Sequence, residues 1–432
     1  MRTRRGSLGR SRPGPQRPGE RQRGRALTGR PPTARVVPLG LRLLEQAWSD
    51  RVPSPPYDAL TPVERTAWVA ANPDSYLAVT QGPEDADDAE IARRLASSRT
   101  TLDRLIADGA FAPLRPAAFY VLGVSWQGRR HLAVVGGVPV ADIENGGVRL
   151  HERVRPDRAG HLARHLDVVG AQSSPLHLAH RPTPELRGVV AVVADGEPAL
   201  EVHADDGLVQ QVWTVPPGDS ATMGACLEGV ALYLIDGHHR TAAAIAHRDH
   251  AGPGPADRVL AAVYDADDLD NRAFHRFLAL GDAAEAFLAS VAAAFPTRTR
   301  PATGAAVDPA LADRHDDELA LYHRGTWHLV TVPPEPGRLG RLDPARFQRL
   351  VDLGLRAPAY DDRLRFRPGV IPLPDLFAEA DAEGAVLGVM RPVAVPDLLA
   401  VADDGAIMPP KSTYFVPKPR SGLFVRPVGT AS

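Results

Sequence analysis

The chain has 432 residues, of which 44% are hydrophobic and 24% charged, values typical of a globular protein with two or three domains. No run of about 18 apolar residues occurs, so the sequence excludes a membrane-spanning helix. Its single cysteine, Cys226, excludes an internal disulfide and a cysteine-rich metal site. We therefore expect a cytoplasmic protein.

Residues 1–35 differ in composition from the rest of the chain. They carry eleven arginines and one acid, Glu20, whereas the formal net charge of the whole chain is −2. This glycine- and proline-rich segment contains too few apolar residues to offset the entropy of ordering, so we expect a disordered tail. The alternative is an arm that binds nucleic acid, but the acidic remainder of the chain offers no basic surface to continue it.

Apolar periodicity and turn residues predict the elements of the first half of the chain. Helices are expected where a capping residue or proline precedes a helical pattern. In chain order, the predicted elements are a strand and short helix in 36–48, a rigid proline turn at 53–58, helices at 61–71 and 85–108, strands at 117–122 and 131–135, a hairpin turn at 145–147 between strands 138–143 and 148–150, and a helix at 158–169.

The same patterns continue through the second half. The predicted elements are strands at 188–193, 210–215, 231–235 and 259–264, helices at 241–249, 271–280 and 283–294, a polar boundary at 296–316, a hairpin of 318–323 with 327–332, helices at 344–353 and 374–382, and a strand at 385–390. Within the helix at 271–280, His275 and Arg276 would lie on a salt-bridged surface. The mixture predicts an α+β protein, with a main domain over 36–295 and a smaller C-terminal α+β lobe over 317–432.

The strongest candidate site is the turn Asp236-Gly237-His238-His239-Arg240, between a predicted buried strand and a predicted helix. A turn that opens a helix presents free N–H groups and the positive end of the helix dipole, which favour phosphate binding. Gly237 allows unusual backbone angles, the histidines can donate to anions, and Arg240 can clamp phosphate oxygens. Asp236 is a candidate Mg²⁺ ligand or proton acceptor. The alternative is a structural turn in which Asp236 caps the helix.

Lysine usage points to a second segment. Of 50 basic residues only Lys411 and Lys418 are lysines, and both lie in the stretch from Met408 to Gly422. Lysine is a compact point charge that the planar guanidinium of arginine does not replace. We interpret this segment as a loop of the C-terminal lobe that closes over phosphates, rather than a chance cluster in a surface loop. Its candidate phosphate-binding residues are Lys411, Ser412, Thr413, Lys418, Arg420 and Ser421.

Two further segments supply weaker candidates. In the charged stretch 151–158, Glu152 is a candidate general base, with Arg155 as a charge clamp and His151 as a substrate contact. A solvated charge cluster that leads into a helix explains this stretch equally well. Tyr57 and Asp58 lie on the rigid proline turn, where they either contact substrate or only anchor the turn.

Six segments resemble, in this order, those of the bacterial and archaeal family called domain of unknown function 1015. They are Ser54–Asp58, Pro116–Tyr120, His151–Pro156, Ser173–Pro175, Asp236–Arg240 and Lys411–Gly422. The turn at 236–240 also resembles the phosphate-binding motif of the ParB/sulfiredoxin superfamily, most closely that of its free-serine kinases. The resemblance implies a mixed-sheet ParB/sulfiredoxin-like core with added strands and helices. At two places, Thr241-Ala242 and Arg153-Val154, the chain has other residues than the family commonly has, whereas the Asp236–Arg240 turn is intact. The resemblance therefore implies phosphate binding more strongly than it implies any one substrate.

The motifs and the resemblance together predict a small-molecule phosphotransferase. It would move a phosphoryl group between ATP or ADP, bound with Mg²⁺, and a hydroxyl-bearing metabolite such as L-serine. One alternative is a nucleotide-binding switch without turnover. Another alternative is a ParB-like DNA-binding protein. The net acidic charge of the chain after residue 35 and the lack of a helix-turn-helix pattern argue against it.

Overall fold

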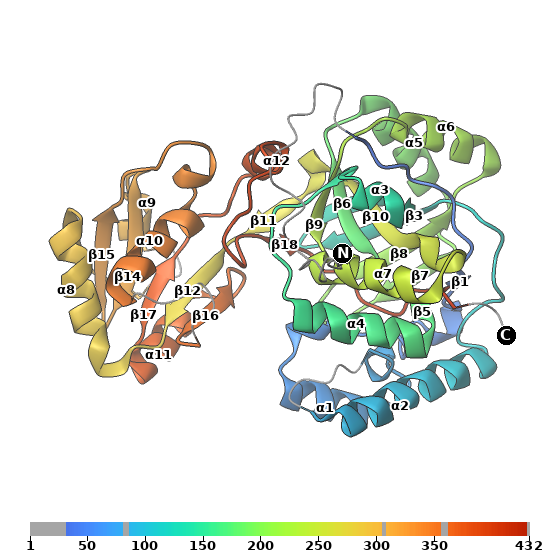
Figure 1. Ribbon diagram of the computed structural model, residues 1–432, viewed down its shortest axis with the longest axis horizontal. Coiled ribbons are helices and arrows are strands. Elements are labelled where there is room, and N and C mark those ends of the chain that lie inside the picture. Colours follow the sequence, from blue (N-terminus) through green and yellow to red (C-terminus); the bar gives the residue numbers. More distant parts are fainter. Residues whose placement is uncertain (1–31, 81–85, 305–307, 356–361, 430–432) are drawn as a thin grey trace, which may run out of the picture.

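The computed structural model describes residues 32–80, 86–304, 308–355 and 362–429. Most of the tail expected at 1–35 therefore lies outside the described residues. The described chain forms a larger and a smaller lobe (Figure 1). Among the described residues, no helix is both long and apolar enough to cross a membrane.

The larger lobe is built on an eight-stranded mixed sheet. Two strand pairs are parallel, β4 with β9 and β6 with β10, and the others are antiparallel. This arrangement confirms an α+β protein with a mixed sheet, while its likeness to a ParB/sulfiredoxin core stays a prediction. In sheet order the strands are β4 (Val148–Arg149), β9 (Leu232–Asp236), β6 (Leu176–His180), β10 (Arg258–Asp265), β3 (Arg129–Pro139), β2 (Tyr120–Trp126), β8 (Val209–Thr214) and β7 (Leu200–His203).

Hydrophobic clusters cover both faces of this sheet. On one face, Leu186 and Val190 of α5 and Met223 of α6 pack against apolar residues of the strands. On the other face, Leu102 of α2 and Leu398 of α12 pack against the sheet. The helices of the larger lobe are α1 (Pro62–Ala71), α2 (Asp88–Ala107), α3 (Val140–Glu144), α4 (Pro156–Val169), α5 (Pro184–Ala194), α6 (Pro217–Leu227) and α7 (His238–Ala251), and α12 (Val395–Asp403) joins them from the C-terminal part of the chain.

The smaller lobe contains a six-stranded antiparallel sheet. Its strands in order are β13 (Thr297–Pro301), β15 (Thr326–Thr331), β14 (Glu318–His323), β17 (Val386–Val389), β12 (Phe274–Leu278) and β16 (Leu364–Pro368), and its helices are α8 (Ala284–Ala294), α9 (Pro309–Ala312), α10 (Asp343–Leu355) and α11 (Leu373–Glu383). Helices α8 and α10 pack on one face and α11 on the other. Because β12 and β13 belong to this sheet, the boundary expected at 296–316 falls inside the smaller lobe.

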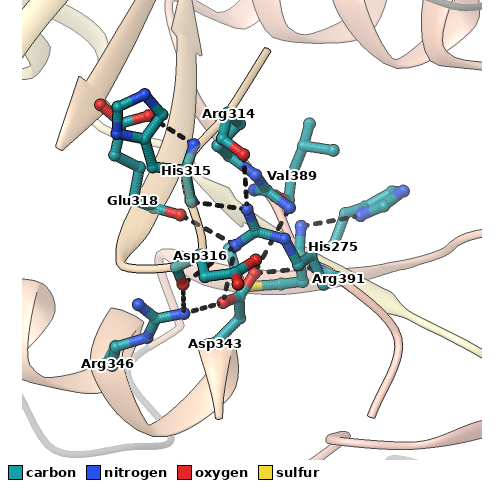
Figure 2. A network of polar contacts seen from close by, with 10 residues as sticks. His275, Arg314, His315, Asp316, Glu318, Asp343, Arg346, Val389 and Arg391 are labelled. Atoms are coloured by element: carbon teal, nitrogen blue, oxygen red, sulfur yellow. Dashed lines mark hydrogen bonds and ion pairs between the residues drawn. The ribbon is translucent and has the colours of Figure 1, made fainter. Parts of the chain in front are cut away.

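A buried charge network holds one edge of the smaller lobe together (Figure 2). The carboxylate of Asp343 accepts hydrogen bonds from Arg346 at 2.5 Å and from the backbone N–H of Arg391 at 2.9 Å. Arg314 lies 3.6 Å from the same carboxylate and donates to the carbonyl of Val389. One buried carboxylate thus balances several guanidinium groups.

The chain passes between the lobes twice. Strand β11 (Asp270–Arg272) leads out of the larger lobe, and the chain returns to it with α12, after which β18 (Tyr414–Val416) pairs antiparallel with β11. Strand β19 (Phe424–Pro427) then pairs with β1 (Arg42–Leu43) and β5 (Ala171–Gln172). The end of the segment predicted as part of the C-terminal lobe, residues 421–427, therefore lies against the larger lobe.

Three local predictions were wrong. Residues 188–193 form part of helix α5, and residues 270–278 form strands β11 and β12 where a helix was expected. The turn at 145–147 does not join a hairpin, because Asn145 ends helix α3 and β4 pairs in parallel with β9. The strands at 231–235 and 259–264, the hairpin at 318–332 and the helices at 61–71 and 158–169 are confirmed to within a few residues.

Candidate functional site

The turn between β9 and α7 adopts a conformation that requires glycine. Gly237 has φ +107°, and a Cβ atom there would lie 3.0 Å from Cδ2 of Leu176 and 3.1 Å from Nε of Arg240. In the described part of the chain, no side chain caps the N-terminus of α7. The first N–H groups of α7 therefore remain available to an anion, and the helix dipole adds positive potential there.

Asp236 does not cap the helix, contrary to the structural alternative for this turn. Its carboxylate accepts a 3.0 Å hydrogen bond from Nη2 of Arg240 and keeps 39% of its side-chain surface exposed. Burial would raise the pKa of Asp236, but the charges of Lys418, Arg240 and Lys411 outweigh burial and hold that pKa far below its usual range. Asp236 is therefore ionised near neutral pH.

The lysine-bearing segment faces this turn. Lys411 has φ +54°, and its ammonium lies 5.2 Å from the ring centroid of Phe274, while that of Lys418 lies 5.5 Å from the ring of Tyr414. The segment is also bound to the larger lobe through Ser421, which bridges to Ser54 and whose hydroxyl lies 2.9 Å from that of Ser174. Both lysines of the chain are thus held on one wall.

Arg276 supports that wall from behind. It is buried on β12 and donates hydrogen bonds to the carbonyls of Phe274, Pro410 and Lys411 at 3.1, 3.1 and 2.9 Å. The expectation that His275 and Arg276 lie on a helix surface was therefore wrong. Burial lowers the pKa of Arg276 to about 9, although the charge of Glu152 acts to raise it. The guanidinium stays charged at neutral pH and fixes the backbone that carries Lys411.

Glu152 and the two histidines of the turn have perturbed pKa values. Burial raises the pKa of Glu152, and the charge of Asp236 adds to this effect while Lys411 opposes it. Burial lowers the pKa of both His238 and His239 to about 4, so both imidazoles are neutral at pH 7. The site therefore holds one easily protonated carboxylate, one strongly acidic carboxylate and neutral imidazoles.

These groups meet in a cavity of about 320 Å³. Its size falls in the range of roughly 300–1,000 Å³ that is usual for small-molecule sites. Among the described residues that line it, five are basic and two are acidic, so the cavity suits an anion. The charged lining residues are Arg158, Arg240, Lys411, Lys418, Arg420, Glu152 and Asp236.

The structure brings most of the candidate residues together. Besides these charged groups, predicted residues in the lining are Tyr57, Gly237, His238, His239, Thr413 and Ser421.

Three predicted residues whose side chains are described do not line the cavity, and a fourth cannot be placed. Ser412 is buried with its hydroxyl bonded to the carbonyl of Pro409, and Arg155 pairs with Asp157 on the outside. His151 lies buried behind the lining, and the side chain of Asp58 lies outside the described residues.

Sequence reasoning missed several residues of the site. Arg158, His161, Ser173, Ser174 and His177 line the cavity, and His177 lies opposite Asp236 in the pairing of β6 with β9. Arg158 and the two serines lie in segments that the sequence had marked, but their place in the site follows from strand pairing and from the packing of α4 against α7.

A comparison with known protein families identifies the family of this chain. A family model described as "Protein of unknown function (DUF1015)" matches residues 39–352. The chain belongs to this family. The DUF1015 match confirms the family suggested by the motifs, and it ends before the wall that carries Lys411 and Lys418. No curated protein matches the chain.

Several solved structures are similar to the DUF1015 chain at low identity. A free serine kinase in complex with AMP has 14% identity and a TM-score of 0.36, covering 67% of this chain and 90% of that one. A conserved hypothetical protein from Pyrococcus furiosus has 14% identity and a TM-score of 0.34, covering 67% and 94%. SbnI with a C-terminal truncation, from Staphylococcus aureus, has 14% identity and a TM-score of 0.36, covering 66% and 84%. At scores this low, the function has to be argued from the site itself.

Proposed function

We propose that the protein is a small-molecule phosphotransferase that moves a phosphoryl group between a nucleotide, ATP or ADP, and a hydroxyl acceptor such as L-serine. The observation that carries this proposal is the convergence in one cavity of an uncapped helix N-terminus, both lysines of the chain and a carboxylate of raised pKa. The first two features suit phosphate, and the third suits proton transfer.

The phosphates of the nucleotide would lie against the start of α7. There the free N–H groups, the guanidinium of Arg240 and the ammonium groups of Lys411 and Lys418 can neutralise their charge. A Cβ atom at Gly237 would crowd Arg240, so the glycine keeps the anion-binding side of the turn open. This part of the site supports binding.

Glu152 is the better candidate for general base. Its raised pKa makes it a stronger base than Asp236, whose pKa is held far below its usual range. In the proposed step the acceptor hydroxyl gives its proton to Glu152 as its oxygen bonds to the terminal phosphorus. The bond from that phosphorus to the bridging oxygen breaks, and Lys411 and Arg240 stabilise the charge left on the nucleotide.

Asp236 would help to hold Mg²⁺. Such ions usually bind through one or two carboxylates plus substrate phosphates, and Asp236 is an ionised carboxylate beside the proposed phosphate position. Asp236 would hold the ion close to the phosphates, where its positive charge would offset theirs. The neutral His238 and His239 would donate hydrogen bonds to substrate oxygens without adding charge.

The proposal is tested by ligand-dependent melting of residues 32–432. ATP, ADP, CTP and pyrophosphate, each with Mg²⁺ and with or without L-serine, are added, because a ligand that binds only the folded state raises the melting temperature. We expect a nucleotide to raise it, and the shift to disappear in Arg240→Ala. Arg248→Ala, on the same helix but outside this cavity, is the matched control and should retain the shift.

Phosphoryl transfer is measured separately by ³¹P NMR with L-serine as acceptor. Transfer that falls at least about 100-fold in Glu152→Gln, with nucleotide binding retained, supports the assignment of the base. Binding without transfer to any hydroxyl acceptor would make the protein a nucleotide-binding switch. If no phosphate compound shifts the melting temperature, the nucleotide site is refuted.

A further inference from the structure

A cluster of metal-ligand side chains lies at the inner end of the cavity. One nitrogen of His151, one carboxylate oxygen of Glu152 and one nitrogen of His238 all lie within 4.8 Å of one another. His151 and Glu152 follow β4, whereas His238 is the first residue of α7. The two imidazole rings meet edge to face, with centroids 4.6 Å apart and an interplanar angle of 85°.

The two imidazoles are buried without the hydrogen bonds that such groups normally make. His151 is 1% exposed and His238 is 7% exposed. Within the described chain, Nε2 of His238 has no hydrogen-bond partner, while the ring of His151 meets the backbone of Leu234 without the geometry of an ordinary hydrogen bond. A buried polar atom without a partner destabilises the fold, and a bound ion or water is a usual way to satisfy such an atom.

The groups around the cluster include lone pairs and negative charge that suit a cation. Imidazole nitrogens bind metals through a lone pair, and Nε2 of His238 has no hydrogen-bond partner within the described chain. The carboxylates of Glu152 and Asp236 supply negative charge. Lys411, Arg276 and the N-terminus of α7 oppose a cation, and they will limit its affinity.

We propose that His151, Glu152 and His238 form a binding site for a divalent transition-metal ion such as Zn²⁺ or Co²⁺. Two imidazoles and one carboxylate are a ligand set typical of zinc, and three protein ligands leave a fourth position open. Glu152 and His238 line the cavity, so both the entry path and the open position are on its side. Ligand atoms about 2.0–2.2 Å from Zn²⁺ are compatible with the 4.8 Å spread of the cluster, with at most small side-chain rotations on binding.

A bound transition-metal ion would compete with the proposed chemistry. Coordination removes the free carboxylate of Glu152, so Zn²⁺ inhibits transfer while Mg²⁺, which prefers oxygen ligands, supports it at Asp236. This consequence rests on the proposed function, whereas the binding site itself does not.

The site is tested on metal-free full-length protein with Co²⁺ and Zn²⁺ as probes, in the absence of nucleotide. Visible absorption follows Co²⁺ binding, and titration calorimetry gives the stoichiometry and affinity for Zn²⁺. We expect one ion per chain, with affinity reduced at least about 10–100-fold in His151→Ala and in Glu152→Gln. His203→Ala is the matched control. His203 lies on the surface and pairs with Glu201 alone, so this variant should bind the same number of ions as the wild type.

Circular dichroism first establishes that each variant is folded. If His151→Ala does not fold, the isosteric Glu152→Gln carries the test. The proposal is overturned if the wild-type protein binds neither ion, or if both ions bind the variants as tightly as the wild type. ATP-dependent melting without any transition metal is measured in parallel, so that a failure of the metal site is distinguished from a failure of the nucleotide site.

Discussion

Replacing Arg276 by lysine tests whether the buried guanidinium positions the lysine-bearing wall. The substitution keeps the positive charge but removes the planar fork that holds three backbone carbonyls. A lysine ammonium on its flexible stem can replace one of these bonds, so two are lost. Hydrogen bonds to charged groups contribute about 1.5–3 kcal/mol each, and the carbonyls of Pro410 and Lys411 can regain water from the cavity. We therefore expect the free energy of unfolding to fall by about 3 kcal/mol.

The effect of Arg276→Lys on ATP affinity distinguishes a role in positioning Lys411 from a role in stability alone. If Lys411 is displaced, ATP loses at least one charge-assisted contact, and its affinity should fall by at least about 10-fold, or 1.4 kcal/mol. Urea unfolding followed by tryptophan fluorescence gives the stability, and calorimetry below the unfolding transition gives the ATP affinity. Arg272→Lys, in an exposed ion pair on the neighbouring strand, should change stability by less than about 0.5 kcal/mol. A folded Arg276→Lys protein with wild-type ATP affinity would refute the positioning role.

Three more outcomes follow from the structure. Because burial raises the pKa of Glu152 in the ligand-free protein, the acid limb of a kcat/KM profile against pH should lie above the usual glutamate range and be absent in Glu152→Gln. The buried His238 and His239 have pKa values of about 4, so a kcat/KM inflection near pH 6.5 that His238→Gln or His239→Gln abolishes would contradict this picture. Asp343→Asn removes the buried carboxylate that pairs with the guanidinium groups of Figure 2, and it should lower the free energy of unfolding, measured in urea, by about 3–5 kcal/mol. A loss below about 1 kcal/mol, similar to that of the exposed control Asp352→Asn on the same helix, would show that the network contributes little.

The turn at 236–240 was predictable because its signals are local. An apolar run, a glycine and then a helical pattern occur within a few residues, and the structure places them as β9, Gly237 and α7. The helix at Pro62–Ala71 was predictable for a similar reason, since Thr61 and Glu64 form a capping box. The two lysines stood out in the sequence because all the remaining Lys and Arg positions are arginine.

The failures came from competing local signals and from long-range pairing. The run 188–193 is rich in valine and suggested a strand, but Pro184 and Glu185 begin a helix that buries Leu186, Val190 and Val193 on one face. In β12 the residues on both faces of the strand are buried, so no polar alternation marks it, and its partners β16 and β17 lie far along the chain. The role of Arg276 could not be seen without that pairing.

The order in which the cavity walls occur along the chain has a consequence for synthesis. Glu152 and the turn at 236–240 are made early, whereas the segment with Lys411 and Lys418 is made much later, and β19 then pairs with β1 near the start of the described chain. On the ribosome, the nascent larger lobe would expose its cavity without the lysine-bearing wall until this last segment emerged. Nucleotide could therefore make its full set of contacts with the newly made protein only after that segment had emerged, which links tight ligand binding to completion of the wall.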